Sequence, residues 1–159
     1  MEKKYGIITC MDSRFDPISI TDLPPEHTYV IRNAGGRVNA DTIRSMTIAH
    51  KFMGIKEWFI IHHTDCMVGK LNDEIILKAL KSNLQTAEFN GHDWVNDDRF
   101  ETEDNSESIN KIEWQTFSDL KQSVIDDLNA IRENSLIPDT VEVKGFIYDL
   151  TGNTIDPVD

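Results

Sequence analysis

Three short runs of β-branched and aromatic residues constrain the fold most. They cover residues 5–10, 28–32 and 57–62. Unbroken apolar runs of this length are typical of strands that are covered on both faces, as in parallel sheets. A fourth run, 141–150, predicts a further strand, and the turn sequence after it predicts a short antiparallel terminal strand.

Between these runs, apolar residues recur at helical spacing. Segments 40–53, 71–87 and 117–131 each place apolar side chains on one face, which predicts amphipathic helices. Gly54 follows the first of them, as is typical of a helix end. Strands that alternate with helices indicate the α/β class, with a central, mainly parallel sheet and right-handed crossovers. We expect the strand order 2-1-3-4 in a single three-layer domain, with flanking helices, that spans residues 1–159.

The segment 88–114 follows neither the helical nor the strand period. It is polar and acid-rich, as in DWVNDDRFETEDNSES. Such a composition is typical of a surface segment that buries little apolar area. We therefore expect an acidic surface loop or lid here.

Composition excludes two classes of partner. No apolar run approaches the roughly 20 residues that span a bilayer, and the N-terminus lacks the apolar stretch of a signal peptide. The net charge of -12 would repel a nucleic acid. We expect a cytoplasmic protein that binds neither membrane nor nucleic acid.

Two polar motifs follow predicted strands, CMDSR after the first and HHTDC after the third. Ligands of open α/β sheets bind beyond the carboxyl ends of strands, where the strand order reverses. If the first strand lies between the second and the third, the two motifs become neighbours. Cys10, His63 and Cys66 then supply two thiolates and an imidazole, a ligand set of catalytic zinc with one position left over. The alternative for the two cysteines is a pair of buried, reduced thiols.

Asp12 and Arg14 are candidates for catalytic roles beside that metal. Asp12 is placed to accept a hydrogen bond from a zinc-bound hydroxide, or to occupy the fourth zinc position in a closed state. Arg14 can hold Asp12 off the metal through a bidentate pair, so the two would act as a latch. The alternative is a solvated surface pair that contributes little.

The motifs CMDSR (10–14), VIRNAGGRV (30–38) and HHTDC (62–66) together resemble the β-class carbonic anhydrase family. The resemblance implies one Zn²⁺ per subunit, held by Cys10, His63 and Cys66. It implies reversible hydration of carbon dioxide to bicarbonate by a zinc-bound hydroxide, since zinc lowers the pKa of bound water from about 15.7 to about 7. It also implies a homodimer or a higher even oligomer.

The loop after the second predicted strand contains Ala34, Gly35 and Gly36. Glycines permit positive φ and close backbone approach, so we expect the amides of this loop to bind oxygens of the substrate or of bicarbonate. The loop is not G-x-G-x-x-G, which argues against a nucleotide-phosphate site.

Three other polar residues have structural interpretations. His62 would point to the face of an extended strand opposite to His63, so we expect a packed or hydrogen-bonded histidine. His50 lies on the apolar face of its predicted helix and is expected to be a satisfied core histidine. Asp65 is expected to form a turn or to accept a hydrogen bond near the metal.

Two functional alternatives remain open. The same zinc site could hydrolyse carbon disulfide or carbonyl sulfide, as relatives with this core do, because these linear molecules present the same electrophilic carbon. Alternatively, Asp12 permanently closes the metal and the protein is a non-catalytic zinc-binding module. Met67, where family members usually have glycine, and the nine residues before Cys10, where they carry a helical arm, favour this second alternative.

Overall fold

The computed structural model describes residues 2–100 and 105–159, which form two compact units. The first unit contains the described residues up to Gly69 together with Asp119–Asp159. The second unit is Lys70–Ser118.

The first unit is built on a single sheet of five strands. The strands are β1 (Tyr5–Cys10), β2 (Thr28–Asn33), β3 (Glu57–His63), β6 (Glu142–Asp149) and β7 (Thr154–Val158). Their order is β2-β1-β3-β6-β7. The pairs β1–β2, β1–β3 and β3–β6 are parallel, and β7 is antiparallel to β6. The predicted α/β class, the predicted strand order and the antiparallel terminal strand are therefore confirmed.

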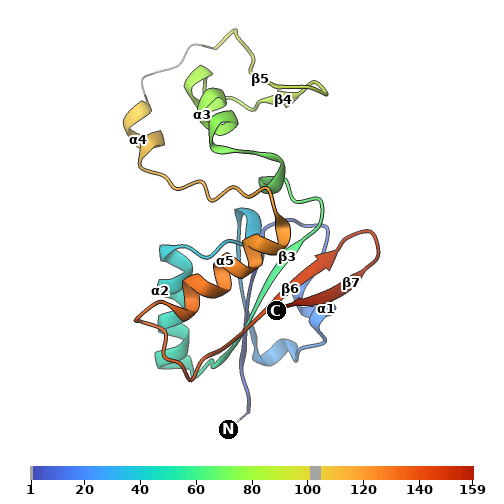
Figure 1. The fold of residues 1–159 in the computed structure, drawn as a ribbon, viewed down its shortest axis with the longest axis vertical. Coiled ribbons are helices and arrows are strands. Elements are labelled where there is room, and N and C mark those ends of the chain that lie inside the picture. The colour runs from blue at the N-terminus through green and yellow to red at the C-terminus, as the bar shows by residue number, and fades with distance from the viewer. Residues whose placement is uncertain (1, 101–104) are drawn as a thin grey trace. The chain divides into compact units, whose positions relative to one another are not determined.

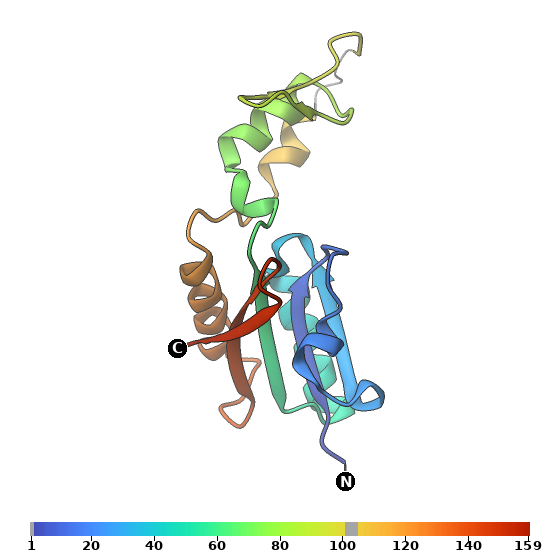
Figure 2. The same cartoon turned by 90° about the vertical axis from the view of Figure 1, so that its right-hand side faces the viewer.

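Helices cover both faces of this sheet (Figures 1 and 2). The first unit contains α1 (Pro17–Thr21), α2 (Ala40–Ile48), α5 (Leu120–Arg132), the 3-10 turns η1 (Pro25–His27) and η2 (Ala34–Gly36), and the π-helical turn η3 (Ala49–Met53). Helices α2 and α5 pack on one face, and α1 packs on the other. No helix in the described part of the chain is long and apolar enough to cross a membrane.

The core forms two clusters, one on each face of the sheet. Ile8 and Ile60 pack against α2 and α5, whereas Ile7 and Ile61 pack on the α1 side. Successive side chains of a strand point to opposite faces, so each strand supplies both clusters. This explains why the apolar runs of β1 and β3 are unbroken.

The start of α5 is fixed by a capping side chain. The periodicity predicted a helix from residue 117, but the helix begins at Leu120. The Asp119 carboxylate accepts a hydrogen bond from the backbone N–H of Gln122 at 2.9 Å, which satisfies a donor of the first turn.

The predicted helix 40–53 changes its geometry along its length. It is α-helical as far as Ile48 and continues as the π-helical turn η3 to Met53. Gly54, at φ 77°, ends it in the left-handed region, as the sequence predicted.

The second unit is made of short elements. They are α3 (Asp73–Ser82), β4 (Glu88–Phe89), β5 (Trp94–Val95) and α4 (Ser106–Asn110). The helix predicted over 71–87 is thus shorter at both ends. Its start is set by the Asn72 side chain, which accepts a hydrogen bond from Ile75 N at 2.8 Å. The segment 88–114 contains an antiparallel pair of strands and one helix, while residues 101–104 lie outside the described residues. Its role as a lid stays a prediction.

Candidate metal centre

Cys10, His63 and Cys66 come together at the carboxyl ends of β1 and β3. Their potential ligand atoms all lie within 4.8 Å of one another. The two Sγ atoms are 3.9 Å apart, so the cysteines are free thiols. The side chains are buried, with 5%, 1% and 6% exposure in chain order. Because β1 lies between β2 and β3, the cluster sits where the strand order reverses.

The His63 ring is oriented with one nitrogen toward the cluster. Its Nδ1–H donates to the Thr64 carbonyl at 2.8 Å, which leaves the lone pair on Nε2. This Nε2 is buried and has no hydrogen-bond partner within residues 2–100 and 105–159. A buried polar atom without a partner is costly unless a ligand binds it. An imidazole lone pair beside two sulfurs fits a zinc ion, and the backbone carbonyl behind the ring is the usual support of such a ligand.

Thr64, whose carbonyl orients His63, is itself held by the end of β6 and by the residue that follows it. The Thr64 hydroxyl donates to Asp149 Oδ1 at 3.2 Å and accepts from Leu150 N at 3.0 Å. The Thr64 N–H donates to the Tyr148 carbonyl at 2.9 Å. The Phe15 ring packs against the imidazole, with ring centroids 5.2 Å apart. The imidazole ring is therefore fixed from two sides.

The two thiols differ in acidity in the metal-free protein. A hydrogen bond from the Cys66 thiol lowers the pKa of Cys10, and the backbone amides of Asp12 and Gly35 act in the same direction. The same contact raises the pKa of Cys66, and burial raises it further. The pair therefore behaves as one thiolate and one thiol that share a proton.

Arg14 holds the Asp12 carboxylate next to the cluster. Its Nε and Nη2 donate to the two carboxylate oxygens at 3.0 Å and 2.7 Å, in the bidentate geometry typical of such pairs. The hydrogen bonds from Arg14 lower the pKa of Asp12 to about 2. Asp12 Oδ2 lies 3.9 Å from His63 Nε2. The contact expected from the C-x-D-x-R spacing is present, and the catalytic roles of both residues stay predictions.

Asp65 and Arg32 extend this pair on either side. Arg14 Nη1 donates to Asp65 Oδ2 at 2.7 Å, and Asp65 adopts φ 57°, so this residue both forms a turn and accepts a hydrogen bond, as predicted. Arg32 was not singled out from the sequence. Its Nε donates to the Cys10 carbonyl at 2.8 Å, and its Nη2 donates to the Asp12 carbonyl. The feature of the sequence that could have identified Arg32 is a cationic residue at the end of β2, the strand that pairs with β1.

The η2 turn lies directly against the end of β1. Gly35 and Gly36 adopt φ values of 80° and 67°. A Cβ on Gly36 would lie only 2.7 Å from the backbone nitrogen of Cys10, so only glycine fits there. The sequence predicted a close backbone approach at this loop. In the structure, the backbone that the loop approaches is that of β1. Substrate binding by Ala34, Gly35 and Gly36 stays a prediction.

Comparison with known proteins places this site in a family. Residues 5–155 match the family model for carbonic anhydrase. The chain belongs to the β-carbonic anhydrase family. Its relatives include β-carbonic anhydrase 1 of Mycobacterium tuberculosis, which is 27% identical over 158 residues, 98% of this chain and 82% of that protein. They also include the carbon disulfide hydrolase of Saccharolobus solfataricus, 30% identical over 155 residues, 94% of this chain and 74% of that protein.

The fold agrees with a solved carbonic anhydrase. The crystal structure of the Streptococcus mutans enzyme superposes with a TM-score of 0.79 at 28% identity, over 99% of this chain and 84% of that one. The quoted motifs reach only residue 66, whereas the family match continues to residue 155. The β-carbonic anhydrase assignment therefore also covers α5 and β6.

Two further histidines of the first unit lie outside the cluster. His62 is 1% exposed and forms hydrogen bonds with Ser123 and Asp127 of α5. The Nδ1 of His50, a half-buried residue, hydrogen-bonds the Ile55 carbonyl at 3.2 Å. The structural interpretation of His62 is confirmed, and His50 is hydrogen-bonded as predicted but half-buried, so its placement in the core was wrong.

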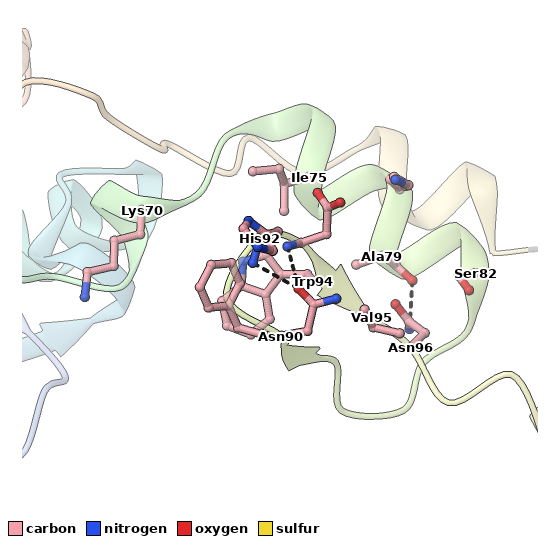
Figure 3. Close-up of a pocket in the computed structure, with 12 residues that line it drawn as sticks. Lys70, Ile75, Ala79, Ser82, Asn90, His92, Trp94, Val95 and Asn96 are labelled. Atoms are coloured by element: carbon pink, nitrogen blue, oxygen red, sulfur yellow. Dashed lines mark hydrogen bonds between the residues drawn. The ribbon is translucent and has the colours of Figure 1, made fainter.

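The second unit has a cavity of its own, of about 600 Å³ (Figure 3). Ile75 and Ala79 of α3 form one side, and His92 and Trp94 of the β4–β5 hairpin form the other. Asn96 Nδ2 closes one end by donating to the Ala79 carbonyl at 3.2 Å. None of the candidate metal ligands lines this cavity.

Proposed function

We propose that the protein is a zinc-dependent carbonic anhydrase that reversibly hydrates carbon dioxide to bicarbonate and a proton. The observation that carries this proposal is the buried His63 Nε2, which lies beside two sulfur atoms and has no hydrogen-bond partner among the described residues. Cys10, His63 and Cys66 would hold one zinc ion per subunit. When bound there, zinc would supply the Lewis acidity that makes water nucleophilic near neutral pH.

In this proposal, Asp12 orients the attacking water. Its pKa of about 2 keeps the carboxylate ionised at neutral pH, so it only accepts hydrogen bonds. Arg14 fixes the carboxylate by the bidentate pair, and Asp65 holds the other side of the guanidinium. The Asp12 oxygens are thereby kept off the sulfur and nitrogen atoms that would bind the metal.

We assign the substrate oxygens to the loop of Ala34, Gly35 and Gly36. Both glycines have positive φ, Gly36 packs against the backbone of Cys10, and the Gly35 amide interacts with the Cys10 thiol, so this loop lies directly beside the candidate metal ligands. Amide donors at this place would bind the oxygens of carbon dioxide without adding a charge.

A second candidate activity is hydrolysis of carbon disulfide or carbonyl sulfide at the same centre. It is favoured by the 30% identity with the carbon disulfide hydrolase of S. solfataricus. The three substrates are linear molecules with an electrophilic central carbon, so the residues above would take the same parts.

The test compares the activities on one preparation. The protein is loaded with zinc, its metal content is measured, and carbon dioxide hydration is followed by stopped flow above and below pH 8. Sulfide release from carbon disulfide and carbonyl sulfide is measured in parallel. We expect one zinc per chain and carbon dioxide hydration. Sulfide release without hydration would support the second candidate, whereas bound zinc without turnover of any substrate would support a non-catalytic module.

We also propose a homodimer or a higher even oligomer in the cytoplasm. The support is the family to which the chain belongs. Sedimentation of the zinc-loaded protein tests the oligomer, and a monomer at micromolar concentration would contradict it.

A further inference from the structure

Four buried polar residues form a connected group on the α5 side of the sheet. We call this group the Asp127 cluster. Its members are Arg37, His62, Ser123 and Asp127, with exposures of 7%, 1%, 1% and 2%. They come from the loop after η2, from β3 and from α5.

Asp127 is the common acceptor of the cluster. Arg37 Nε donates to Asp127 Oδ2 at 3.0 Å, and Arg37 Nη2 donates to Oδ1 at 3.0 Å. The Nε2–H of His62 donates to Asp127 Oδ2, also at 3.0 Å. His62 Nδ1 and the Ser123 hydroxyl oxygen are 2.7 Å apart and share a hydrogen bond.

Stability alone is a poor reason for such a group. Removing charged groups from water has a large cost, and well-packed apolar side chains in place of a buried ion pair are often equally stable or more so. What a buried polar group does impose is geometry, because each donor must stay within hydrogen-bond distance of its acceptor.

Arg37 connects the Asp127 cluster to the loop that packs against Cys10. Arg37 directly follows Gly36, whose Cα packs against the backbone of Cys10. Asn33 closes the same loop, since its side chain accepts from Arg37 N at 2.8 Å and donates to the Arg37 carbonyl at 2.7 Å. The ion pair with Asp127 therefore holds the loop against the end of β1.

His62 connects the Asp127 cluster to His63. His62 and His63 are consecutive in β3, so their side chains leave the backbone on opposite faces. With the His62 ring fixed at both nitrogens, the backbone of the strand end is also fixed. That backbone sets the direction in which the His63 imidazole points.

We propose that Asp127 is a positioning residue for the metal centre, which fixes the separation between Cys10 and His63 and thereby raises the affinity for zinc. This inference rests on the proposed function, because it assumes that these residues bind zinc. Asp127 does not touch the metal and acts through Arg37 and His62.

Glu57 offers a matched control at the other end of β3. It is also a buried carboxylate, 4% exposed, and it also pairs with two cations, Lys3 and Lys144. Asp127→Asn and Glu57→Gln each remove one buried negative charge and keep the shape of the side chain. They differ in position: Asp127 contacts Arg37 and His62, next to the ends of β1 and β3 where Cys10 and His63 lie, whereas Glu57 lies at the opposite end of β3.

The experiment measures zinc affinity by competition with a chromophoric chelator. We expect Asp127→Asn to weaken zinc binding about 10- to 100-fold, as is typical of residues that support metal ligands. We expect Glu57→Gln to leave it within about twofold, even where both variants unfold at similarly lowered temperatures. The absorption bands of the Co²⁺-substituted protein should shift in Asp127→Asn and stay unchanged in Glu57→Gln.

A milder variant keeps the test decisive if Asp127→Asn does not fold. Ser123→Ala removes only the hydroxyl that fixes His62 Nδ1, and we expect it to weaken zinc binding severalfold. Equal zinc affinity in wild type and in the folded variants would overturn the inference, as would equal weakening by Glu57→Gln. Failure of the wild type to bind zinc would instead refute the proposed function.

Discussion

His62 and His63 are neighbours in β3, but their imidazole rings belong to opposite faces of the sheet. The His62 ring hydrogen-bonds Asp127 and Ser123 on the α5 side. The His63 ring packs against Phe15 on the α1 side, and its Nε2 has no hydrogen-bond partner in the part of the chain that is described. The pleat of one strand thus separates a structural histidine from a candidate ligand.

Substitution of each histidine should separate these two roles. We expect His63→Gln to abolish zinc binding, because the amide supplies no imidazole nitrogen to the two sulfurs. His62→Gln should retain zinc with an affinity about 10- to 100-fold lower, since only the support of the ligand is lost. The zinc content of each variant after dialysis against a weak chelator measures both effects, the loss of zinc by His63→Gln and its retention by His62→Gln. Retention of zinc by His63→Gln would contradict the assignment of the ligands.

Zinc binding should release about one proton at pH 8, because ligand thiols must be deprotonated and only Cys66 still carries its proton. The contact with Cys66 lowers the pKa of Cys10, whereas the contact with Cys10 raises that of Cys66. Calorimetry in buffers of different ionisation enthalpy counts the protons. Release of about two protons would show that a second ligand, the Cys10 thiol or the His63 imidazole, also carries a proton before the metal binds.

The pKa of Asp12 should depend on Arg14. Hydrogen bonds from Arg14 lower this pKa to about 2, so Arg14→Gln should move it toward 3.8. Because the folded-state pKa is the lower one, the pair stabilises the fold above about pH 4, and this stabilisation is lost as the pH falls toward 2. Carboxyl chemical shifts of the metal-free protein report the titration.

Asp97 and Arg99 provide the control, because they form the same D-x-R contact in the second unit. Arg99 lowers the pKa of Asp97 through hydrogen bonds. Arg99→Gln should raise the pKa of Asp97 and leave the pKa of Asp12 and the hydration rate unchanged. An unchanged Asp12 titration in Arg14→Gln would disprove the bidentate contact in solution.

Gly36→Ala and Gly54→Ala should differ, although both glycines have positive φ. A Cβ on Gly54 meets nothing within 4 Å, so that variant carries only the backbone strain, about 1 kcal/mol. A Cβ on Gly36 would collide with the backbone nitrogen of Cys10. We expect Gly36→Ala to lose more unfolding free energy than Gly54→Ala. We expect weaker zinc binding in Gly36→Ala only. Denaturant unfolding and chelator competition measure the two effects, and equal losses in both variants would refute the close approach as the cause.

The strand order and the Cys-His-Cys cluster were predictable because their signals are local. Each motif follows an apolar strand, and parallel strands bring their carboxyl ends to one edge. Helix ends were less predictable, since capping by Asn72 and Asp119 depends on single side chains that periodicity does not detect.

The support of the site was missed for a different reason. Arg37 and Asp127 are 90 residues apart in the chain, and no local pattern pairs them. A weak signal existed, because Asp127 falls on the same helical face as Val124 and Ile131, which are buried. A charged residue on an apolar helix face indicates a buried partner, but only the fold identifies that partner as Arg37 and His62.

The first unit is discontinuous in the chain, and this has a consequence for its biosynthesis. All three candidate ligands precede Lys70, whereas α5 and β6 follow Ser118. As the chain leaves the ribosome, the sulfurs and the imidazole emerge well before the helix that braces them and the strand that pairs with β3. We expect the nascent chain to acquire tight metal affinity only after its last quarter has been translated, so premature termination would leave exposed thiols with no stable metal site.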